Sequence, residues 1–333
     1  MRGLNLLRSG LCLLGCVFLL TLFFLPPAGA KPVIVDSKHK FSPGKSKQTS
    51  QTASRIISLS RDKEIKCRPT PPQKLAVGRL PSSITSRSAI VMDARTGNTI
   101  YSRAANMAGQ PASTIKILTG LLALDTLQRK DTVKVSRRAA RMPRSKIYLR
   151  AGKSYNADDL INAVLLASAN DASVALAEKI GGSERGFASL MTHRARRLGA
   201  ENTVCKTASG LTSRGQKSTA KDLAVVFNEI MKNTEFAERI KKIKVRTRFG
   251  KVLRNHNRAL WQVSGAEGGK TGYTRLARQT YVGKFKRGRN ELLVAIMGSE
   301  TMWHDINTLV EYGFSCQAKL AAVQQQNEVL PQA

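Results

Sequence analysis

QPASTIKILTGLLAL, residues 110–124, places a serine and a lysine three positions apart at the start of a long apolar run. From Ser113 to Leu127 the predicted helix is apolar on nearly every side, which is typical of a helix buried in a core. Residues three apart in a helix lie on one face, so Ser113 and Lys116 are within reach of each other. The helix N-terminus adds free backbone N–H groups and a partial positive charge beside Ser113.

The Ser-x-x-Lys pattern recurs in the chain, and its context selects one copy. It is also present at positions 37, 42, 60 and 218. The first three lie in a basic stretch rich in Ser, Thr, Gln and Pro, where nothing holds a side chain in place. Ser218 precedes an amphipathic helix and is typical of a helix cap. Only Ser113 opens a buried helix, so we take Ser113 as the candidate nucleophile and Lys116 as its base.

Two further motifs supply partners for this pair. A serine needs a base to become nucleophilic, and a lysine can be that base when burial or a second cation lowers its pKa. Lys270 is the candidate cation, in the one Lys-Thr-Gly motif of the chain. In Ser168-Ala169-Asn170, we expect the Ser168 hydroxyl to relay a proton to the leaving amine. The Asn170 amide would hold Lys116 and the substrate backbone.

The Lys-Thr-Gly motif also predicts how a substrate is bound. Lys270 and Thr271 would hold a substrate carboxylate. The strand residues after Gly272 would dock an extended peptide along the strand edge. The expected oxyanion hole consists of the backbone N–H groups of Ser113 and Tyr273. We expect neither a cofactor nor a metal, because no Cys-His cluster is present.

Residue patterns predict strands near both ends of the globular region and helices between them. The expected strands are 88–93, 99–102, 269–274, 279–285 and 291–297. After the Ser113 helix, further helices are expected from about 157, at 172–179, at 185–198, after the capping pair Ser218-Thr219, and at 302–312. This order predicts an α+β fold in which an antiparallel sheet is flanked by helices.

The N-terminal region reads as an export signal followed by a linker. Residues 1–30 combine an early positive charge, an apolar stretch and a small-residue end, as a secretory signal peptide does. An uncleaved anchor or lipidation at Cys16 are the alternatives. Residues 31–80 form a basic linker that we expect to be disordered. The catalytic domain is then expected at 81–318 and a tail at 319–333.

The charge and the cysteines limit the possible partners. Fifty-five Lys and Arg against 22 Asp and Glu give a net charge of +33, which attracts polyanions such as an anionic cell-envelope polymer or a membrane surface. Aromatic residues make up only 5% of the chain, which argues against nucleic acid. Cys67, Cys205 and Cys316 favour buried or free thiols, although one pair could form in an oxidising compartment.

The motifs together resemble the low-molecular-weight penicillin-binding proteins, the D-alanyl-D-alanine carboxypeptidases. The resemblance runs from about residue 86 to 314. It rests on Pro111 to Lys116, Ala167 to Ala172, Leu198 to Thr203, Ser209-Gly210-Leu211, Ser218 to Leu223, Asn255-His256-Asn257 and Gly269 to Thr274.

This resemblance implies both a fold and a reaction. The fold would be of the β-lactamase/transpeptidase type, with a helical subdomain that carries Ser168 and Asn170. The enzyme would attack the D-Ala-D-Ala bond of a peptidoglycan stem pentapeptide, form an acyl-enzyme on Ser113 and release the terminal D-Ala. β-Lactams would acylate the same serine.

Two departures from the family pattern affect these expectations. Many members carry a second, β-rich domain and a C-terminal amphipathic anchor, whereas residues 317–333 show no strong amphipathic face. We therefore expect an exported protein of the periplasm or cell envelope. Some carboxypeptidases also place an arginine within the Asn-x-Asn segment to bind the terminal carboxylate. His256 holds that place here, with Arg258 two residues on, so His256 is the candidate substrate-binding residue.

The alternatives are a D,D-endopeptidase that cuts cross-links, a β-lactamase, and a non-catalytic basic wall-binding protein. A β-lactamase usually needs a glutamate after the second motif. Glu178, Glu184 and Glu201 are candidates by position alone. All three chemical motifs are complete, which argues against the non-catalytic alternative.

Overall fold

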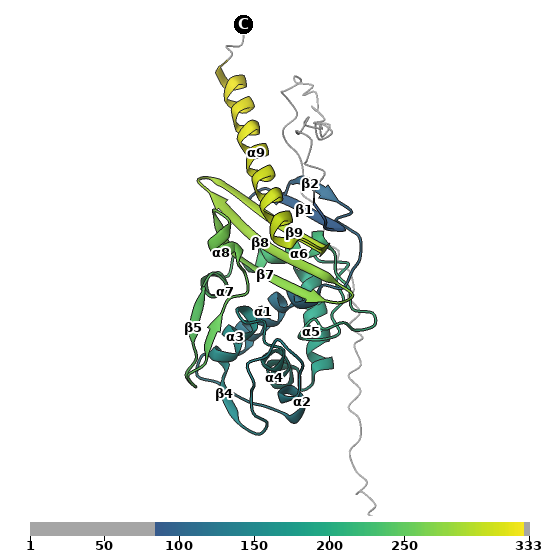
Figure 1. Cartoon of the computed structure of the whole chain (residues 1–333), viewed down its shortest axis with the longest axis vertical. Coiled ribbons are helices and arrows are strands. Elements are labelled where there is room, and N and C mark those ends of the chain that lie inside the picture. Colours follow the sequence, from purple (N-terminus) through teal and green to yellow (C-terminus); the bar gives the residue numbers. More distant parts are fainter. Residues whose placement is uncertain (1–83, 330–333) are drawn as a thin grey trace, which may run out of the picture. The chain divides into compact units, whose positions relative to one another are not determined.

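A computed structural model describes residues 84–329 of the 333-residue chain (Figure 1). The predicted signal peptide, the basic linker, Cys16 and Cys67 therefore lie outside the described residues. Within 84–329, no helix is both long enough and apolar enough to cross a bilayer. Cys205 and Cys316 are buried free thiols.

A five-stranded antiparallel sheet joins the two ends of the described chain, as the sequence predicted. Its strands are β1 (Ser88–Asp93), β2 (Thr99–Arg103), β7 (Ala266–Thr274), β8 (Arg278–Arg287) and β9 (Asn290–Ser299). Their order in the sheet is β2-β1-β9-β8-β7, so early β1 pairs directly with late β9 (Figure 1). Strand β7, which carries Lys270, lies at one edge.

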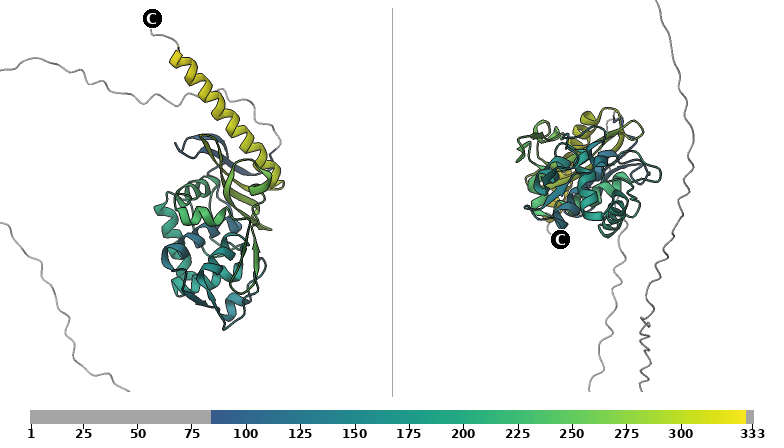
Figure 2. Two further views of the ribbon diagram at one scale, coloured as in Figure 1. Left: turned by 90° about the vertical axis from the view of Figure 1, so that its left-hand side faces the viewer. Right: turned by 90° about the horizontal axis from the view of Figure 1, so that it is seen from below.

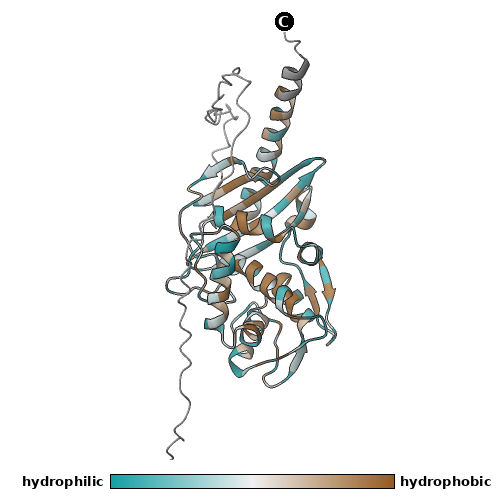
Figure 3. Cartoon of the chain, turned by 180° about the vertical axis from the view of Figure 1, so that it is seen from behind, coloured by the Kyte–Doolittle hydropathy of each residue, from teal (hydrophilic) through white to brown (hydrophobic). Residues whose placement is uncertain are grey.

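Each face of the sheet packs against helices. Val91, Val294 and Ile296 share a core with α9 (Met302–Val329). Their neighbours in sequence point the other way, because side chains alternate along a strand. Ile90 and Leu293 accordingly join the larger core of the helical subdomain. Figure 2 shows α9 on one side of the sheet and most of the other helices on the opposite side, and Figure 3 shows apolar residues concentrated in the strands and inner helices.

The helical subdomain has more elements than the sequence predicted. Its helices are α1 (Lys116–Thr126), α2 (Arg137–Ala140), α3 (Ala157–Leu165), α4 (Asn170–Gly181), α5 (Glu184–Arg197), α6 (Ala220–Ile230) and α7 (Thr234–Ile240). The short helix α8 (Ala259–Gln262) instead joins the core on the α9 face of the sheet. Two ribbons accompany them, β3 (Thr132–Lys134) with β4 (Ser154–Asn156), and β5 (Lys244–Arg246) with β6 (Val252–Arg254). The short α2, α7 and α8 and both ribbons were not predicted, because they are too short to show a periodic pattern.

The last helix is longer than expected. We expected it at 302–312, but α9 continues to Val329, through the position at which we drew the tail. Gly313, which directly follows the predicted end, serves close packing. A Cβ at this position would lie 2.7 Å from Leu292 Cδ1 and 2.9 Å from Val91 Cγ1. The glycine therefore lets the helix approach the sheet.

Candidate active site

Ser113 and Lys116 lie together at the junction of the sheet and the helical subdomain. Ser113 is in a 3-10 turn, Ala112–Ile115, rather than in the first turn of the α-helix that follows. The Lys116 side chain is buried, and its Nζ lies 2.8 Å from Ser113 Oγ. The same nitrogen lies 2.8 Å from Asn170 Oδ1 and 2.5 Å from the carbonyl oxygen of Ser209. Three oxygens thus surround one buried amine.

The surroundings of Lys116 favour its neutral form. Burial lowers its pKa well below the usual range, and the positive charge of Lys270 lowers it further. The carboxylate of Asp171 acts in the opposite direction and does not cancel these effects. An uncharged amine can accept a proton from a neighbouring hydroxyl, which is the property required of a base.

Ser168 and Lys270 form a second pair. Lys270 Nζ lies 2.9 Å from Ser168 Oγ, and it also donates to the Thr271 carbonyl at 3.1 Å. Ser168 adopts a left-handed backbone conformation (φ +55°) in the connection before α4. Burial lowers the pKa of Lys270 to about 7. Its charge is therefore sensitive to small changes in its surroundings near neutral pH.

The loop between α2 and β4 sets the orientation of the Asn170 amide. Asn170 Nδ2 donates to the carbonyls of Pro143 and Arg144 at 3.0 and 3.1 Å. The Asn170 backbone N–H donates to the carbonyl of Ser145 at 2.7 Å. With the amide nitrogen occupied by this loop, the amide oxygen faces Lys116.

Strand β7 passes next to the backbone of Ser113. A Cβ added to Gly272 would lie 2.7 Å from Ser113 N and 2.5 Å from Thr280 Oγ1, so only glycine fits there. Thr280 in turn donates to the Pro111 carbonyl at 2.9 Å, which ties the nucleophile turn to β8. Thr271 is half-buried and Tyr273 is exposed, both on the edge strand.

The side chains of His256 and Arg258 lie in different surroundings. The surrounding protein, and then the charges of Lys270 and Lys116, lower the pKa of His256 to about 4. The ring, although exposed at the surface, is therefore neutral at pH 7. Arg258 instead places its guanidinium 5.5 Å from the ring of Trp303 on α9. Of the two residues, only His256 is close to the two catalytic-site lysines.

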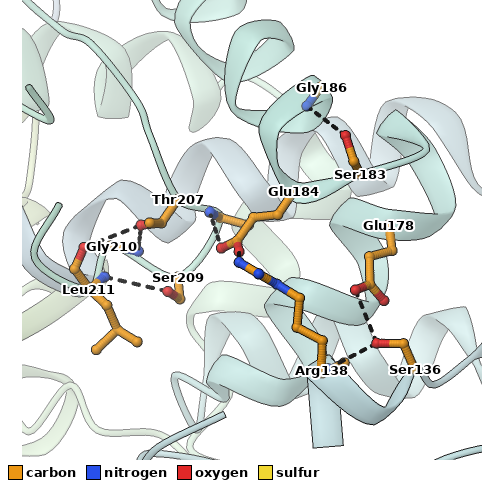
Figure 4. A network of polar contacts seen from close by, with 12 residues as sticks. Ser136, Arg138, Glu178, Ser183, Glu184, Gly186, Thr207, Ser209, Gly210 and Leu211 are labelled. Atoms are coloured by element: carbon orange, nitrogen blue, oxygen red, sulfur yellow. Dashed lines mark hydrogen bonds and ion pairs between the residues drawn. The ribbon is translucent and has the colours of Figure 1, made fainter. Parts of the chain in front are cut away.

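Sequence reasoning missed the residues that hold the Ser209 carbonyl. Ser209 lies in a loop that follows α5, and the preceding Ala208 N–H donates to Glu184 at 3.2 Å. Figure 4 shows Glu184 between this loop and Arg138, whose guanidinium lies 2.5 Å from its carboxylate. Glu184 is only 7% exposed. The candidate deacylating glutamate is thus engaged in holding the loop, and Glu178 accepts a bond from Ser136. These contacts join residues far apart in sequence, so no local motif announces them.

We expect Glu184→Ala to lower kcat for a stem pentapeptide about ten-fold and to destabilise the fold by ~1–3 kcal/mol, because the buried Ala208 N–H loses its acceptor. Glu184→Gln keeps an acceptor oxygen and should recover most of kcat. Steady-state kinetics and thermal unfolding test this prediction, with Glu178→Ala as the matched control. A full kcat in Glu184→Ala, together with lower stability, would restrict Glu184 to a structural role.

A catalytic serine with a lysine base, between an antiparallel sheet and a helical subdomain, defines the class of penicillin-binding serine peptidases. A family model described as D-alanyl-D-alanine carboxypeptidase matches residues 75–301. The chain belongs to this family, and it is a serine hydrolase of D-Ala-D-Ala peptides. The predicted resemblance and reaction class are confirmed.

Similar proteins and structures agree with this assignment. The chain is 37% identical over 237 residues to the D-alanyl-D-alanine carboxypeptidase DacB2 of Mycobacterium tuberculosis, which covers 68% of this chain and 81% of that protein. A crystal structure of a carboxypeptidase from the same organism superposes with a TM-score of 0.69 at 34% identity, covering 72% of this chain and 95% of that one. An ampicillin-bound penicillin-binding protein of Listeria monocytogenes gives a TM-score of 0.65 at 27% identity, covering 70% of this chain and 99% of that one. The predicted β-lactamase/transpeptidase-type fold is confirmed.

Proposed function

We propose that this enzyme removes the terminal D-Ala from peptidoglycan stem pentapeptides through an acyl-enzyme on Ser113. The observation that carries this proposal is the set of three oxygens around Lys116 Nζ. A neutral amine has two N–H groups and one lone pair. If the N–H groups go to Asn170 Oδ1 and the Ser209 carbonyl, the lone pair is directed at the hydroxyl of Ser113.

The reaction then follows from these positions. Ser113 Oγ attacks the carbonyl carbon of the penultimate D-Ala, and its proton passes to Lys116. The backbone N–H groups of Ser113 and Tyr273 would stabilise the oxyanion. As the amide bond breaks, Ser168 relays a proton to the nitrogen of the departing D-Ala. Water then hydrolyses the ester and regenerates Ser113.

Substrate binding would use the free edge of β7. An extended peptide can pair with an edge strand through its backbone. Lys270 and Thr271 would hold the terminal carboxylate. Because the His256 ring is neutral at pH 7, it would act as a hydrogen-bonding group, and Lys270 would supply the positive charge.

We also propose that β-lactams acylate Ser113, since the similar protein of Listeria monocytogenes is solved in an ampicillin-bound form. Residues 1–30 would direct export, and the enzyme would act in the periplasm or at the cell envelope. The net charge of +33 would hold it near an anionic envelope polymer or membrane surface, so its association with envelopes should weaken as salt rises.

Product analysis tests the carboxypeptidase assignment against the endopeptidase alternative. Purified enzyme is incubated with a stem pentapeptide and, separately, with cross-linked muropeptide dimers. The products are identified by mass spectrometry. We expect free D-Ala and a tetrapeptide from the first substrate. Cleavage of dimers alone would favour the endopeptidase. Absence of any product, with no labelling of Ser113 by fluorescent penicillin, would favour a non-catalytic binding protein.

The pKa of Lys270 predicts the alkaline limb of the pH profile. Lys270 binds a carboxylate only when protonated, and burial lowers its pKa to about 7 in the free enzyme. We therefore expect kcat/KM to fall as pH rises through about 7. In kcat alone the fall should come at higher pH, because a bound carboxylate stabilises the ammonium. Lys270→Arg, which stays charged, should lose this limb. A flat kcat/KM between pH 6 and 9 would contradict the assignment.

A further inference from the structure

A cavity of about 780 Å³ opens between the 147–156 segment and the turn that joins β5 to β6. None of its lining residues takes part in the proposed reaction. Its lining combines the aromatic rings of Tyr148, Tyr155 and Phe249 with the cations Arg150, Lys153, Arg248 and Lys251.

Tyr148 is held in a strained conformation at the mouth of this cavity. Its φ is +63°, a value that costs a residue other than glycine on the order of 1–3 kcal/mol. The neighbouring N–H groups of Ile147 and Leu149 both donate to the buried carboxylate of Asp171, at 3.0 to 3.1 Å, and so fix the strained residue from both sides. The Tyr148 side chain nevertheless remains 55% exposed. The fold thus maintains an outward aromatic ring at an energetic cost.

The aromatic rings occur together with ammonium groups. Lys146 Nζ and Lys251 Nζ lie 5.4 and 5.0 Å from the centre of the Tyr148 ring, within cation–π distance. Phe249, at the tip of the turn, is 40% exposed and meets the Tyr155 ring edge to face at 5.1 Å. Two rings therefore present apolar surface to solvent beside fixed positive charge.

The charge of the lining is strongly positive. Within residues 84–329, Arg150, Lys153 and Arg248 make no ion pair, and all three are exposed. The one carboxylate of the lining, Asp159, is buried and accepts the Arg248 backbone N–H at 2.9 Å. This single carboxylate faces four cations of the lining, Arg150, Lys153, Arg248 and Lys251. Three free cations at a concave surface favour an anionic ligand.

Two chain segments connect the lining of the cavity to the catalytic centre. Ser145, whose carbonyl binds Asn170 N, precedes Tyr148 by three residues, a span of at most ~11 Å of chain. On the other side, strand β6 connects the Phe249 turn to His256. Both segments that line the cavity therefore continue to residues of the catalytic centre.

We propose that the cavity binds a glycan strand of peptidoglycan next to the stem peptide under attack. Sugar rings would lie against Tyr148 and Phe249, and carboxylates of neighbouring stem peptides would meet Arg150 and Arg248. This inference rests on the proposed function, which brings this polymer to Ser113. Occupation of the cavity would raise the effective concentration of strand-borne stem peptides at the active site, without a new contact to the scissile bond.

Paired substrates test the inference on the full-length enzyme. The variants are Arg150→Ala/Arg248→Ala and Phe249→Ala, and the charge-matched control is Arg196→Ala/Arg197→Ala on the exposed face of α5. D-Ala release is measured from a soluble stem pentapeptide and from uncross-linked glycan strands that bear pentapeptides. We expect the cavity variants to keep kcat/KM for the soluble peptide within about two-fold and to lose about ten-fold on strands, whereas the control keeps both. Phe249→Tyr should recover the strand activity of Phe249→Ala.

Binding is measured separately from catalysis, by fluorescence anisotropy of labelled strands. If the wild-type enzyme cleaves no pentapeptide, the proposed function fails, and the loss of strand affinity in the cavity variants still decides this inference. Equal losses on both substrates, an equal loss in the control, or unchanged strand affinity would overturn it. Competition by an oligothymidylate as effective as that by the strands would also overturn it, because the cavity would then be a general polyanion site.

Discussion

Lys116→Met is expected to lower kcat/KM for a stem pentapeptide by about 10³- to 10⁴-fold, within the upper range for loss of a general base. Methionine has a similar length and fills the buried space, but it cannot accept the proton of Ser113. The carbonyl oxygens of Asn170 and Ser209 would also lose their donor. The nucleophile would remain in place with no group to activate it.

Fluorescent-penicillin labelling and pentapeptide kinetics measure this effect at two different steps. Both should fall together, because Lys116 acts in acylation whichever substrate is attacked. Ser113→Ala supplies the baseline for complete loss of the nucleophile, and thermal unfolding shows whether Lys116→Met is folded. A folded Lys116→Met variant that retained a tenth of the wild-type rate would require another base.

Gly272→Ala is expected to lower kcat by about 10²- to 10³-fold, the range associated with loss of an oxyanion donor. The added Cβ would lie 2.7 Å from Ser113 N, a distance at which backbone atoms must move. Moving that nitrogen away from β7 displaces one of the two proposed oxyanion donors. It also shifts Ser113 relative to Lys116.

Two matched variants separate this effect from general damage. Gly288→Ala, in a turn with open space around it, should cost stability through its φ of +57° but leave kcat unchanged. The double variant Gly272→Ala/Thr280→Ala removes the clash of the added Cβ with Thr280 Oγ1. It should not restore activity, because the contact with Ser113 N remains. Restored activity in that double variant would instead make Thr280 the important neighbour.

The sheet was predictable from sequence because its strands carry a local signal. Ser88–Asp93 and Asn290–Ser299 each contain a continuous apolar run, because both faces of these strands are buried, and this short run is visible in each segment alone. Pairing of Lys116 with Asn170 was also anticipated from the motifs. The 3-10 turn at Ser113 was not predicted. Gly210 and Gly272, which lie far along the chain, approach Ala112 of this turn closely.

The same reasoning explains the other omissions. Gly313 directly follows the predicted helix end, and only the packing against Leu292 shows why a glycine continues the helix there. Glu184 looked like a free acid, and only the folded chain brings Arg138 and Ala208 to it. Local patterns therefore predicted the elements and motifs, whereas the supports of the site arise from tertiary contacts.

The pairing of β1 with β9 has a consequence for the order of synthesis. Strand β9 lies between β1 and β8, so the sheet cannot form before residues 290–299 have left the ribosome. Nearly the whole catalytic region must be made before its central strand exists, and such long-range pairing is slow to form. The complete sheet of a chain with this topology therefore forms only near the end of its synthesis. The strand order thus keeps the enzyme inactive until its polypeptide is almost complete.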